Sequence, residues 1–591
     1  MVKESIYNAF LRSYKVFPSE HKIKFWISLF LLFINSILEL IGLGILFPLF
    51  SILLTDNFIE KNKAVNRVYN ALNFSNQDHF VLFICGFVII FILLKAVTSI
   101  YIAKFQSKFA FSLYTHFAIN LQKLNYSKGF LHFKQNNSAF LIRDINGMPI
   151  YFAQSFILPS LMLINEFIVI TFLLVSILVF NPFVVLLLAL TVAPISFFAY
   201  LYVKKQIKGI GKIRADQAAE IHSNLEQSIH GYSDVKMTNT EHYFFSEYSK
   251  LVKEFTNVQI KSNILIMLPT KVIEGGTFLG LIAFLLFSYF FIPDKASISM
   301  LLGLFAISAF RILPSINRIM ASLLSIKEHQ FSVDKITQIK LEDNWNNYYD
   351  KPSQNDVLTF EKYIKIENIN FSYNNHDCIL KQLNMTIKKG ETVGIIGRSG
   401  SGKTTLINII LRFLKETSGG ISVDNTLLTD ENIDKWRGII GFVQQDVYII
   451  DGTLKENIAF GIPENEIDYP KLMNCIEQAS LLDLVNKWSS GINTQLGERG
   501  AQLSGGQRQR VGIARALYSN SKILLFDEAT SALDNETEVE ITESIKKLSE
   551  NNLTMIIIAH RYTTLKYCDR IIELRNGEVL REYKYNELVN L

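Results

Sequence analysis

Charged residues are scarce in this sequence of 591 residues. Asp, Glu, Lys and Arg together make up 19% of the chain, whereas an average globular protein has about 25%. The formal net charge is only +5, from 59 basic and 54 acidic residues. This excludes a protein that binds nucleic acid through bulk positive charge, so we expect no nucleic-acid partner.

Cysteine is scarcer still. The four cysteines, Cys85, Cys378, Cys475 and Cys568, form no CxxC pair and have no spacing typical of metal ligands. Neither a disulfide framework nor a zinc site is therefore predicted.

Apolar residues are what the chain has in excess. They make up 49% of the sequence, mean hydropathy is +0.22, and the long apolar runs are concentrated in the first 330 residues. Six runs have the roughly 20 residues that a helix needs to cross a bilayer: 25–54, 79–103, 150–179, 182–203, 263–292 and 297–325. A single run is also typical of a buried core helix, but six together predict an all-α membrane domain over residues 1–330.

Lys and Arg are distributed unevenly around these runs. They lie in the first 24 residues and in the two long connections after the second and fourth runs, whereas 180–181 has no charge and 293–296 has one of each sign. By the positive-inside rule, we expect both termini in the cytoplasm and the spans in a bacterial cytoplasmic (inner) membrane. The long connections contain little Gly or Pro, so we expect them to continue the helices beyond the membrane.

The character of the sequence changes at residues 331–358. This stretch is rich in Asp, Asn, Lys and Tyr and contains Pro352 and Ser353, so we expect a domain linker. Over residues 359–591, short apolar runs alternate with polar helical stretches, which is the pattern of an α/β domain. The predicted fold is therefore a six-helix membrane domain, a linker and an α/β domain.

A glycine-rich segment of the second domain has the pattern of a P-loop. It follows a strand-like run and precedes an apolar helical run, and its residues are Gly397, Arg398, Ser399, Gly400, Ser401, Gly402, Lys403, Thr404 and Thr405. Its glycines let backbone N–H groups converge on phosphate oxygens at a helix N-terminus. We expect it to bind ATP, with Lys403 reaching the β- and γ-phosphates and Thr404 holding Mg²⁺.

A second apolar run, 523–526, ends in the acidic pair Asp527 and Glu528. Four consecutive apolar residues suit a parallel strand that is buried on both faces. The C-terminal end of such a strand lies where open α/β sheets bind their ligands. We therefore expect Asp527 in the Mg²⁺ shell and Glu528 next to the water that attacks the nucleotide.

Between these motifs lies a signature-like segment made of Leu503, Ser504, Gly505, Gly506 and Gln507. Together with the P-loop it resembles the ATP-binding cassette (ABC) family, and six spans followed by one cassette resemble an ABC exporter half-transporter. The resemblance implies an α/β P-loop ATPase domain whose hydrolysis of ATP is coupled to transport. It also implies three roles: Tyr373 stacks on adenine, Gln445 belongs to the catalytic site and the Mg²⁺ shell, and His560 contacts the γ-phosphate.

Weaker similarities follow in the order that the family has. Residues 497–500 resemble a loop that contacts the membrane domain, 531–534 the D-loop, and 132–138 and 234–241 the two coupling-helix regions. Gln444 departs from the family, which often has Pro or Ser there. In the family, the signature of one subunit closes over the P-loop of another. Because this chain has one complete set, the resemblance implies a homodimer with two competent sites.

The sixth apolar run carries a polar stripe. Its members recur at spacings of three and four residues and so share one helical face: Ser308, Arg311, Ser315, Arg318 and Ser322. Because arginine binds phosphate in bidentate geometry, we interpret the two arginines, with Ser308 and Ser315, as a site for an anionic headgroup. The alternative is ion pairing with Glu166 or Glu274, although Lys271 lies three residues before Glu274 and can neutralise it.

Residues 309–319 also resemble the sixth span of bacterial lipid-linked oligosaccharide flippases. Residues 57–73 have the pattern of an amphipathic helix, which is either the external helix of these flippases or an ordinary surface helix. The resemblance implies a polyprenyl-pyrophosphate-linked oligosaccharide as cargo, taken from the membrane lipid. Other amphipathic cargoes stay open, namely lipid A, drugs or peptides, and so does the less expected function of an ATP-gated channel or a regulatory subunit.

Overall fold

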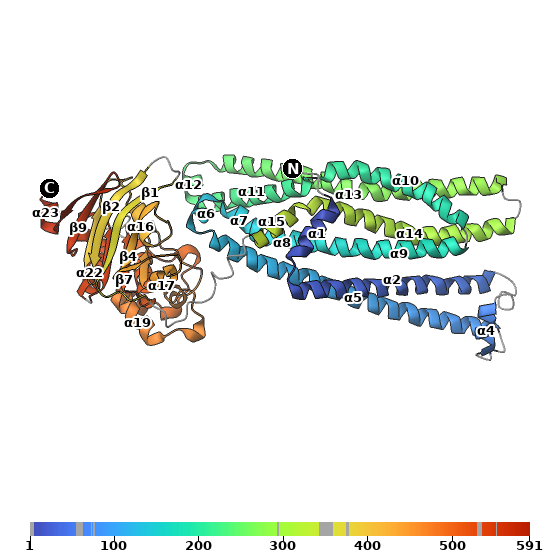
Figure 1. Cartoon of the computed structure of the whole chain (residues 1–591), viewed down its shortest axis with the longest axis horizontal. Helices are drawn as coiled ribbons and strands as arrows, with labels where there is room; N and C mark the ends of the chain where they lie inside the picture. Colours follow the sequence, from blue (N-terminus) through green and yellow to red (C-terminus); the bar gives the residue numbers. More distant parts are fainter. Residues whose placement is uncertain are drawn as a thin grey trace. The chain divides into compact units, whose positions relative to one another are not determined.

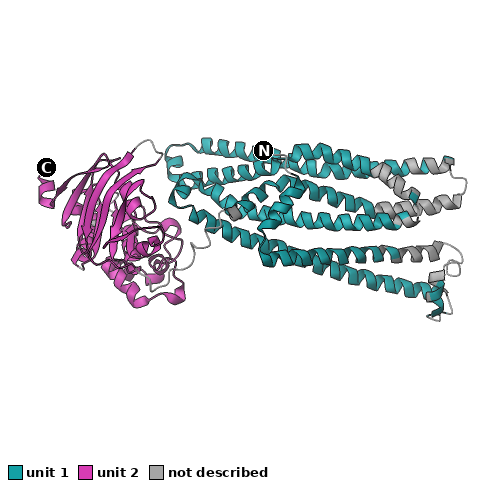
Figure 2. Cartoon of the chain, viewed as in Figure 1, with its two compact units in different colours: residues 1–348 teal, residues 349–591 magenta. Residues whose placement is uncertain are grey.

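The computed structural model describes residues 5–54, 63–71, 74, 77–180, 182–291, 295–341, 358–373, 378–528, 535–550 and 552–590. The chain forms two compact units, unit 1 over Met1–Tyr348 and unit 2 over Tyr349–Leu591 (Figure 2). Unit 1 is helical and unit 2 contains the β-sheets. The order of fold classes that the sequence predicts is therefore confirmed.

The described part of unit 1 consists of long helices joined by short helical segments (Figure 1). They are α1 (Ile6–Val16), α2 (Ser19–Leu54), α4 (Lys63–Ala71), α5 (Gln77–Ser127), α6 (Phe130–Gln135), α7 (Ser138–Ile142), η1 (Arg143–Gly147), α8 (Met148–Tyr151), η2 (Phe152–Ile157), α9 (Leu158–Phe180), α10 (Pro182–Ile207), α11 (Ile210–His230), α12 (Tyr232–Met237), α13 (Glu241–Phe291), α14 (Lys295–His329) and α15 (Phe331–Leu341). The segments η1 and η2 are π-helical turns, which are rare and often mark functional sites.

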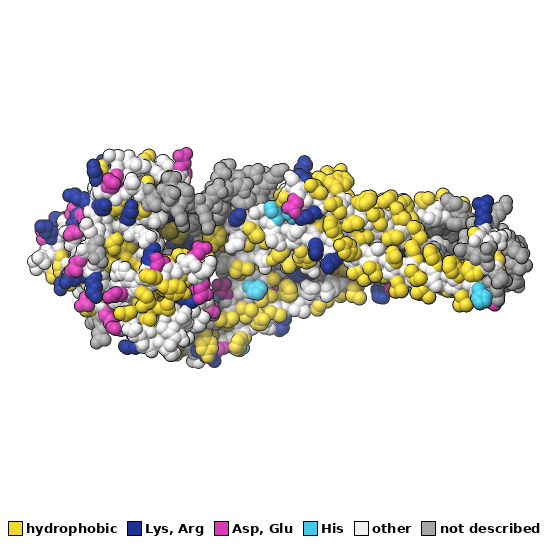
Figure 3. All heavy atoms as spheres, turned by 90° about the horizontal axis from the view of Figure 1, so that it is seen from below, with side chains coloured by type: hydrophobic (Ala, Val, Ile, Leu, Met, Phe, Trp, Pro, Cys, Tyr) yellow, Lys and Arg dark blue, Asp and Glu magenta, His cyan; other side chains and the backbone are white. Residues whose placement is uncertain are grey.

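Each predicted span coincides with helical structure. Four described stretches are long and apolar enough to cross a membrane: Ser19–Gly42, Asp78–Ser127, Ser138–Ser176 and Glu241–Ile282. The other two predicted spans lie in α10 and α14, where part of the side chains falls outside the described residues. Hydrophobic side chains cover a broad band of unit 1 in the view of Figure 3. An exposed apolar band of this kind suits a lipid environment.

A helix occupies the beginning of the predicted linker. Residues 331–341 form α15 rather than an extended segment, because Val333 and Ile336 are fully buried. They share a core with Ala9 of α1 and with aromatic side chains such as Phe17 and Phe152, whose rings meet edge to face with centroids 6.4 Å apart. In this helix polar residues alternate with apolar ones. It was not predicted in the sequence analysis, because a linker was inferred from the polar composition of the stretch. The division at Tyr348 falls inside the predicted linker range.

Unit 2 contains two sheets with helices around them. Its elements are β1 (Tyr363–Ser372), β2 (Cys378–Lys388), β3 (Thr392–Ile396), α16 (Lys403–Ile410), β4 (Ser418–Val423), β5 (Thr426–Leu427), α17 (Ile433–Arg437), β6 (Ile440–Val443), α18 (Leu454–Ile458), η4 (Glu464–Glu466), α19 (Tyr469–Gln478), α20 (Leu482–Lys487), η5 (Gly491–Asn493), η6 (Glu498–Gly500), α21 (Gly505–Tyr518), β7 (Ile523–Asp527), α22 (Asn535–Glu550), β8 (Thr554–Ile558), η7 (Tyr562–Leu565), β9 (Arg570–Arg575), β10 (Glu578–Tyr583) and α23 (Tyr585–Val589).

The larger sheet positions the candidate site. Its strand order is β10-β9-β3-β8-β7-β6, and all strands except β10 run parallel to their neighbours. Strands β3 and β8 are buried along their whole length, as expected for strands covered on both faces. The C-terminal ends of β3, β8 and β7 therefore lie next to one another at one edge. The second sheet, β2-β1-β4-β5, is antiparallel.

Candidate functional site

The loop between β3 and α16 can exist only because glycine occupies two of its positions. A Cβ atom on Gly397 would lie 2.4 Å from the carbonyl oxygen of Leu574. Gly402 has φ +102°, and a Cβ atom there would lie 2.7 Å from the side chain of Leu380. The backbone thus turns tightly from the buried strand into the first turn of α16. Arg398, Ser399 and Gly400 remain exposed at the tip of this loop.

Lys403, the first residue of α16, extends its side chain into this loop. Its ammonium Nζ donates to the carbonyl oxygens of Gly397, at 2.8 Å, and Arg398, at 3.3 Å. Burial lowers the pKa of Lys403, while the carboxylates of Glu528 and Asp527 act in the opposite direction. Its charge is therefore held close to both carboxylates at the edge of the sheet.

A buried hydroxyl in the same loop fits a phosphate ligand. Ser401 is 5% exposed, and its Oγ has no hydrogen-bond partner within the described part of the chain. Because a buried hydroxyl without a partner is costly, the loop is better satisfied with an acceptor bound. Thr404 is exposed on the first turn of α16 and Thr405 is buried. The residues of the loop therefore fit the phosphates of ATP.

Two of the predicted catalytic residues, Gln445 and His560, contact the third, Glu528. The amide Nε2 of Gln445 donates to its Oε2 at 3.1 Å, and Nε2 of His560 lies 2.7 Å from its Oε1. Glu528 follows β7 directly and has φ +49°, a conformation that is costly for a glutamate. Its N–H donates to the carbonyl oxygen of Ile558 in β8, at 3.0 Å. Backbone pairing thus holds the carboxylate in this strained position.

Asp527 forms the last residue of β7. Burial and the neighbouring Glu528 raise the pKa of Asp527, and Lys403 lowers it. Mg²⁺ prefers carboxylate, hydroxyl and amide oxygens, and the predicted ligands Asp527, Thr404 and Gln445 supply one of each kind. The donor set therefore fits this ion.

The predicted adenine platform lies beside the P-loop. Tyr373 is 46% exposed, and its ring stands edge to face on that of Phe371, with centroids 4.9 Å apart at 86°. Its hydroxyl lies 3.4 Å from Oγ1 of Thr405. The contacts with Phe371 and Thr405 hold the ring in place, and its exposure leaves it accessible for stacking on a base.

The predicted signature caps helix α21. Oγ of Ser504 accepts from the N–H of Gln507 at 3.3 Å, and Oε1 of Gln507 accepts from the N–H of Ser504 at 2.9 Å. Gly505 opens the helix and Gly506 is buried in its first turn. This capping box fixes the start of a 14-residue helix, whose N-terminus favours anions.

Gln509 connects the signature helix to Gln445 and was not singled out by the sequence analysis. Its Nε2 donates to the carbonyl oxygens of Gln444, at 3.1 Å, and Gln445, at 2.5 Å. The only indication of Gln509 in the sequence was its position two residues after Gln507. The predicted D-loop, 531–534, lies outside the described residues.

The two predicted coupling regions lie at one end of unit 1. Residues 132–138 cover most of α6 and the start of α7, and residues 234–241 cover most of α12 and the start of α13. Figure 1 shows α6 and α12 at the end of the helical unit that is opposite α4. Helix α7 is joined to α11 by the hydrogen bond from Ser138 Oγ to Glu226, at 3.1 Å.

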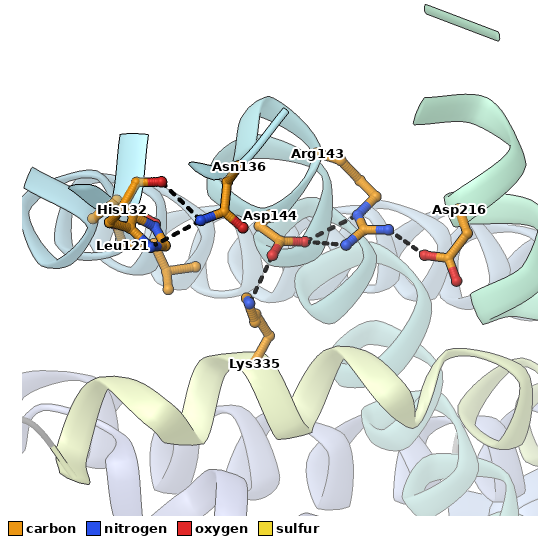
Figure 4. Close-up of polar contacts among 8 residues, drawn as sticks. Leu121, His132, Asn136, Arg143, Asp144, Asp216 and Lys335 are labelled. Carbon is orange, nitrogen blue, oxygen red and sulfur yellow. Dashed lines mark hydrogen bonds and ion pairs between the residues drawn. The ribbon is translucent and has the colours of Figure 1, made fainter. Parts of the chain in front are cut away.

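A chain of alternating charges joins three elements near this end. Arg143 of η1 contacts Asp216 of α11 and donates through Nε to Asp144 at 2.9 Å. Asp144 also accepts from Lys335 of α15, at 2.6 Å. Figure 4 shows Lys335 and Asp216 on opposite sides of the adjacent Arg143 and Asp144. The π-helical segment η1, which follows α7, is thereby tied to α11 and to α15.

The arginines of the predicted substrate stripe are paired with carboxylates. Nε of Arg318 lies 2.8 Å from Oε1 of Glu166, as the alternative interpretation had it. Arg311 pairs with Glu39, a partner that the sequence analysis did not predict, and Ser315 accepts from its Nη1 at 3.3 Å. Lys271 and Glu274 pair with each other at 3.0 Å, as expected. The side chain of Ser308 lies outside the described residues.

Hydrogen bonds extend this cluster across four helices. Ser99 of α5 donates to Oδ1 of Asn35 in α2 at 2.8 Å, and Asn35 donates to Asn165 of α9 at 3.3 Å. Asn165 in turn lies beside Glu166, the partner of Arg318 in α14. These amides were missed in the sequence analysis because their partners lie on other helices, far away along the chain. Helical spacing could have indicated Asn35, because Asn35 and Glu39 are four residues apart and so lie on the same helical face.

Comparisons with known proteins identify the family. Residues 380–531 match the ABC transporter family. An ATP-dependent lipid A-core flippase of Francisella novicida is 30% identical over 413 residues, which cover 68% of this chain and 68% of that protein. The chain belongs to the ABC transporter family. The matched region of this ABC transporter holds the P-loop, Gln445, the signature and Glu528.

Other relatives match shorter stretches of the ABC transporter. An uncharacterized ABC transporter ATP-binding protein of Bacillus subtilis is 41% identical over 241 residues, and a lipid A-core flippase of Ralstonia nicotianae is 39% identical over 229 residues. The chain spans about two fifths of the length of these two relatives.

A solved structure shows the same fold over nearly the whole chain. A bacterial Atm1-family ABC exporter with ATP bound superimposes with a TM-score of 0.72, covers 94% of this chain and 96% of its own, and is 20% identical. The ABC transporter therefore has the exporter fold, a helical domain with apolar helices followed by an α/β cassette. The apolar helices and these relatives make it an integral membrane protein.

Proposed function

We propose that this chain is one half of a homodimeric, ATP-driven exporter in the bacterial inner membrane, with both termini in the cytoplasm. Membership of the ABC transporter family and the exporter fold support the proposal. The observation that carries it is the carboxylate of Glu528, which Gln445 and His560 hold at the strand end where Lys403 also lies. This arrangement suits hydrolysis of a bound nucleotide.

In the proposed reaction, Glu528 accepts a proton from the attacking water while Gln445 and His560 keep its carboxylate in place. Lys403 and the N–H groups of the loop 397–402 stabilise the negative charge of the phosphates. Mg²⁺, held by Thr404, Gln445 and Asp527, supplies further positive charge when it is bound. Tyr373 stacks on the adenine and so places the phosphates against the loop.

Two phosphate cradles in one cassette favour a dimer. The P-loop precedes α16, and the exposed Ser504 begins α21 with Gly505 and Gly506. In this proposal, the signature helix binds the phosphates from the side opposite the P-loop. A single ATP cannot then contact the N-termini of α16 and α21 of the same cassette. The signature of one copy therefore completes the P-loop site of the other, and two equivalent sites form.

The cargo we propose is an amphipathic lipid with a phosphate or pyrophosphate headgroup. Arg311 pairs with Glu39 and Arg318 with Glu166, and a third cation of unit 1, Lys95, lies beside Gly42, three residues after Glu39. Both arginines have their carboxylate, whereas Lys95 has no ion-pair partner among the side chains that the structure describes. The cluster thus carries one excess positive charge, which an anionic headgroup would neutralise.

Lys95 lies on the face that carries the rest of the cluster. Its Nζ is 3.7 Å from a Cβ atom built on Gly42 of α2, and Gly42 shares a helical face with Asn35 and Glu39. Ser99, four residues after Lys95, bonds to Asn35. In this proposal Lys95 binds the headgroup, and Arg311 and Arg318, with Ser308 and Ser315, shape the polar surface around it.

Two cargoes of this chemistry are to be distinguished. The resemblance of residues 309–319 favours a polyprenyl-pyrophosphate-linked oligosaccharide, and the name of the Francisella and Ralstonia relatives favours lipid A. The full chain is reconstituted in proteoliposomes with Mg-ATP. ATPase activity and the transfer of each lipid between leaflets are then measured for wild type, Lys95→Gln and Lys271→Gln.

We expect one of the two lipids to stimulate ATP hydrolysis and to be flipped by wild type. Lys95→Gln should raise the half-maximal lipid concentration at least about fivefold, corresponding to roughly 1 kcal/mol. Lys271→Gln, which removes a lysine of the predicted fifth span that is paired with Glu274, should behave as wild type. If wild type hydrolyses ATP but neither lipid stimulates or moves, the cargo is wrong and the ATPase assignment stands.

A further inference from the structure

A cluster of lysines surrounds the junction of α10 and α11. Lys204, Lys205, Lys208 and Lys212 are all exposed. Helix α10 ends at Ile207, and α11 begins at Ile210 after Gly209, which has φ +87°. We call these four side chains the junction lysines. They lie just after the predicted fourth span, 182–203.

The junction lysines continue an exposed apolar face of α10. Phe197 is 59% exposed and Leu201 45% exposed, and residues 197, 201 and 204 recur at helical spacing on one side of α10, which ends just before Lys208. Tyr202, 58% exposed, lies beside them. A helix face that changes from large apolar side chains to lysine is typical of the membrane surface, where lysine extends its ammonium group toward the headgroups.

No carboxylate lies in the segment that runs from the predicted fourth span through these lysines. The sequence has no Asp or Glu from residue 182 to residue 215. In the described part of the chain, no junction lysine forms an ion pair, and the one polar contact recorded for them is Lys204 Nζ, 5.2 Å from the centroid of the Tyr200 ring.

Helices α13 and α14 both pack against α10 and α11. Glu328 of α14 lies against Gly211 of α11, but it is 2% exposed and pairs with Arg214. Helix α13 has no carboxylate from residue 255 to residue 273. It contributes a further exposed lysine, Lys261. The surface is thus a strongly basic patch that directly adjoins an apolar one.

We propose that the junction lysines bind the headgroups of anionic phospholipids at the membrane surface. A lysine cluster directly after a span attracts anionic lipid, and each lysine near such a surface contributes a factor of about five to the association constant. The adjoining Phe197, Leu201 and Tyr202 would contact the acyl chains. The occupant is a structural lipid on the outside of the helical unit, separate from the proposed cargo at Lys95.

The test uses the purified full chain in a neutral detergent and native mass spectrometry. Dioleoyl phosphatidylglycerol and dioleoyl phosphatidylcholine are titrated separately, and the association constant of the first bound lipid is compared. The test variant replaces all four junction lysines with Gln. A matched control replaces four exposed lysines of unit 2 with Gln: Lys381, Lys389, Lys487 and Lys522.

We expect wild type and the control variant to prefer phosphatidylglycerol at least about fivefold. The junction variant should bind both lipids equally, and replacement of the same four lysines with Arg should retain the preference. Raising the ammonium acetate concentration tenfold should weaken the preference of wild type, because salt screens exposed charges. Equal binding of the two lipids by wild type, or an unchanged preference in the four-Gln variant, overturns the proposal.

Far-UV circular dichroism and ATPase activity in phosphatidylcholine liposomes check that the four-Gln variant is folded. If that variant does not fold, the pairs Lys204→Gln/Lys205→Gln and Lys208→Gln/Lys212→Gln replace it. Each pair should lose part of the preference, and full retention by both pairs overturns the proposal equally.

Discussion

Glu528→Gln is the substitution that isolates the proposed chemistry from binding. The glutamine has the size of the carboxylate, and its amide oxygen can still accept from Gln445, which lies 3.1 Å from Oε2 of Glu528. The backbone bond to Ile558 is unaffected. The variant should therefore fold and bind ATP. What it loses is the proton acceptor and the charge that faces His560, 2.7 Å away.

A positioned general base contributes about a hundredfold to ten-thousandfold to the rate, which corresponds to about 3 to 5 kcal/mol. We expect the turnover number for ATP to fall by this factor. The dissociation constant for Mg-ATP should change less than about threefold, which is below 1 kcal/mol, because Lys403 and the loop 397–402 are intact. ATPase assays in proteoliposomes and equilibrium binding of a fluorescent ATP analogue measure the two quantities.

His560→Ala serves as the comparison, since it removes a positioning contact of Glu528 and leaves the base. Its loss of turnover should be smaller than that of Glu528→Gln. The reasoning is refuted if Glu528→Gln hydrolyses ATP at the wild-type rate, or if it loses ATP binding together with turnover.

Two further predictions concern the clusters described above. Glu166→Gln leaves Arg318 without its carboxylate and should lower the free energy of unfolding by about 2 kcal/mol, less than for a fully buried pair because Arg318 is partly exposed. The double variant Glu166→Gln/Arg318→Gln should recover part of this loss. Thermal unfolding in detergent measures it, and losses of the two single variants that simply add in the double variant would contradict the pairing. Gly402→Ala forces a Cβ atom to 2.7 Å from Leu380 at φ +102° and should cost about 1–3 kcal/mol and weaken ATP binding, whereas Gly86→Ala, with open space around it, should leave both unchanged.

Sequence reasoning located the cassette motifs because their chemistry needs fixed residue types at short spacing. Gly397 to Thr404 cover the loop between a strand and a helix and the first two residues of that helix, and the apolar run before Glu528 is a buried strand. Short-range patterns of this kind are visible without the fold. The structure then brings Gln445, Glu528 and His560 together from three separate strand ends, and their roles remain predictions.

Among the contacts between distant helices, only the pairing of a stripe arginine with Glu166 was anticipated, as an alternative. Arg311 and Glu39 are far apart along the chain, and nothing in their local pattern makes them partners. The amides of Asn35 and Asn165 were missed for the same reason. Helix α15 was missed because composition indicated a linker, while Val333 and Ile336 form helix by packing into the core of unit 1. Tertiary packing decided these cases, and local propensity did not.

The chain of ion pairs that connects α11 to α15 through η1 has a direction. Asp216, Arg143, Asp144 and Lys335 alternate in sign, and among the described residues the outer two form ion pairs with the inner two alone. Exchanging the outer residues, as in Asp216→Lys with Lys335→Asp, would conserve the net charge yet set like charges against each other at both ends. The order of the charges therefore favours the observed pairing of α11 with Arg143 and of α15 with Asp144, and it disfavours the reverse pairing.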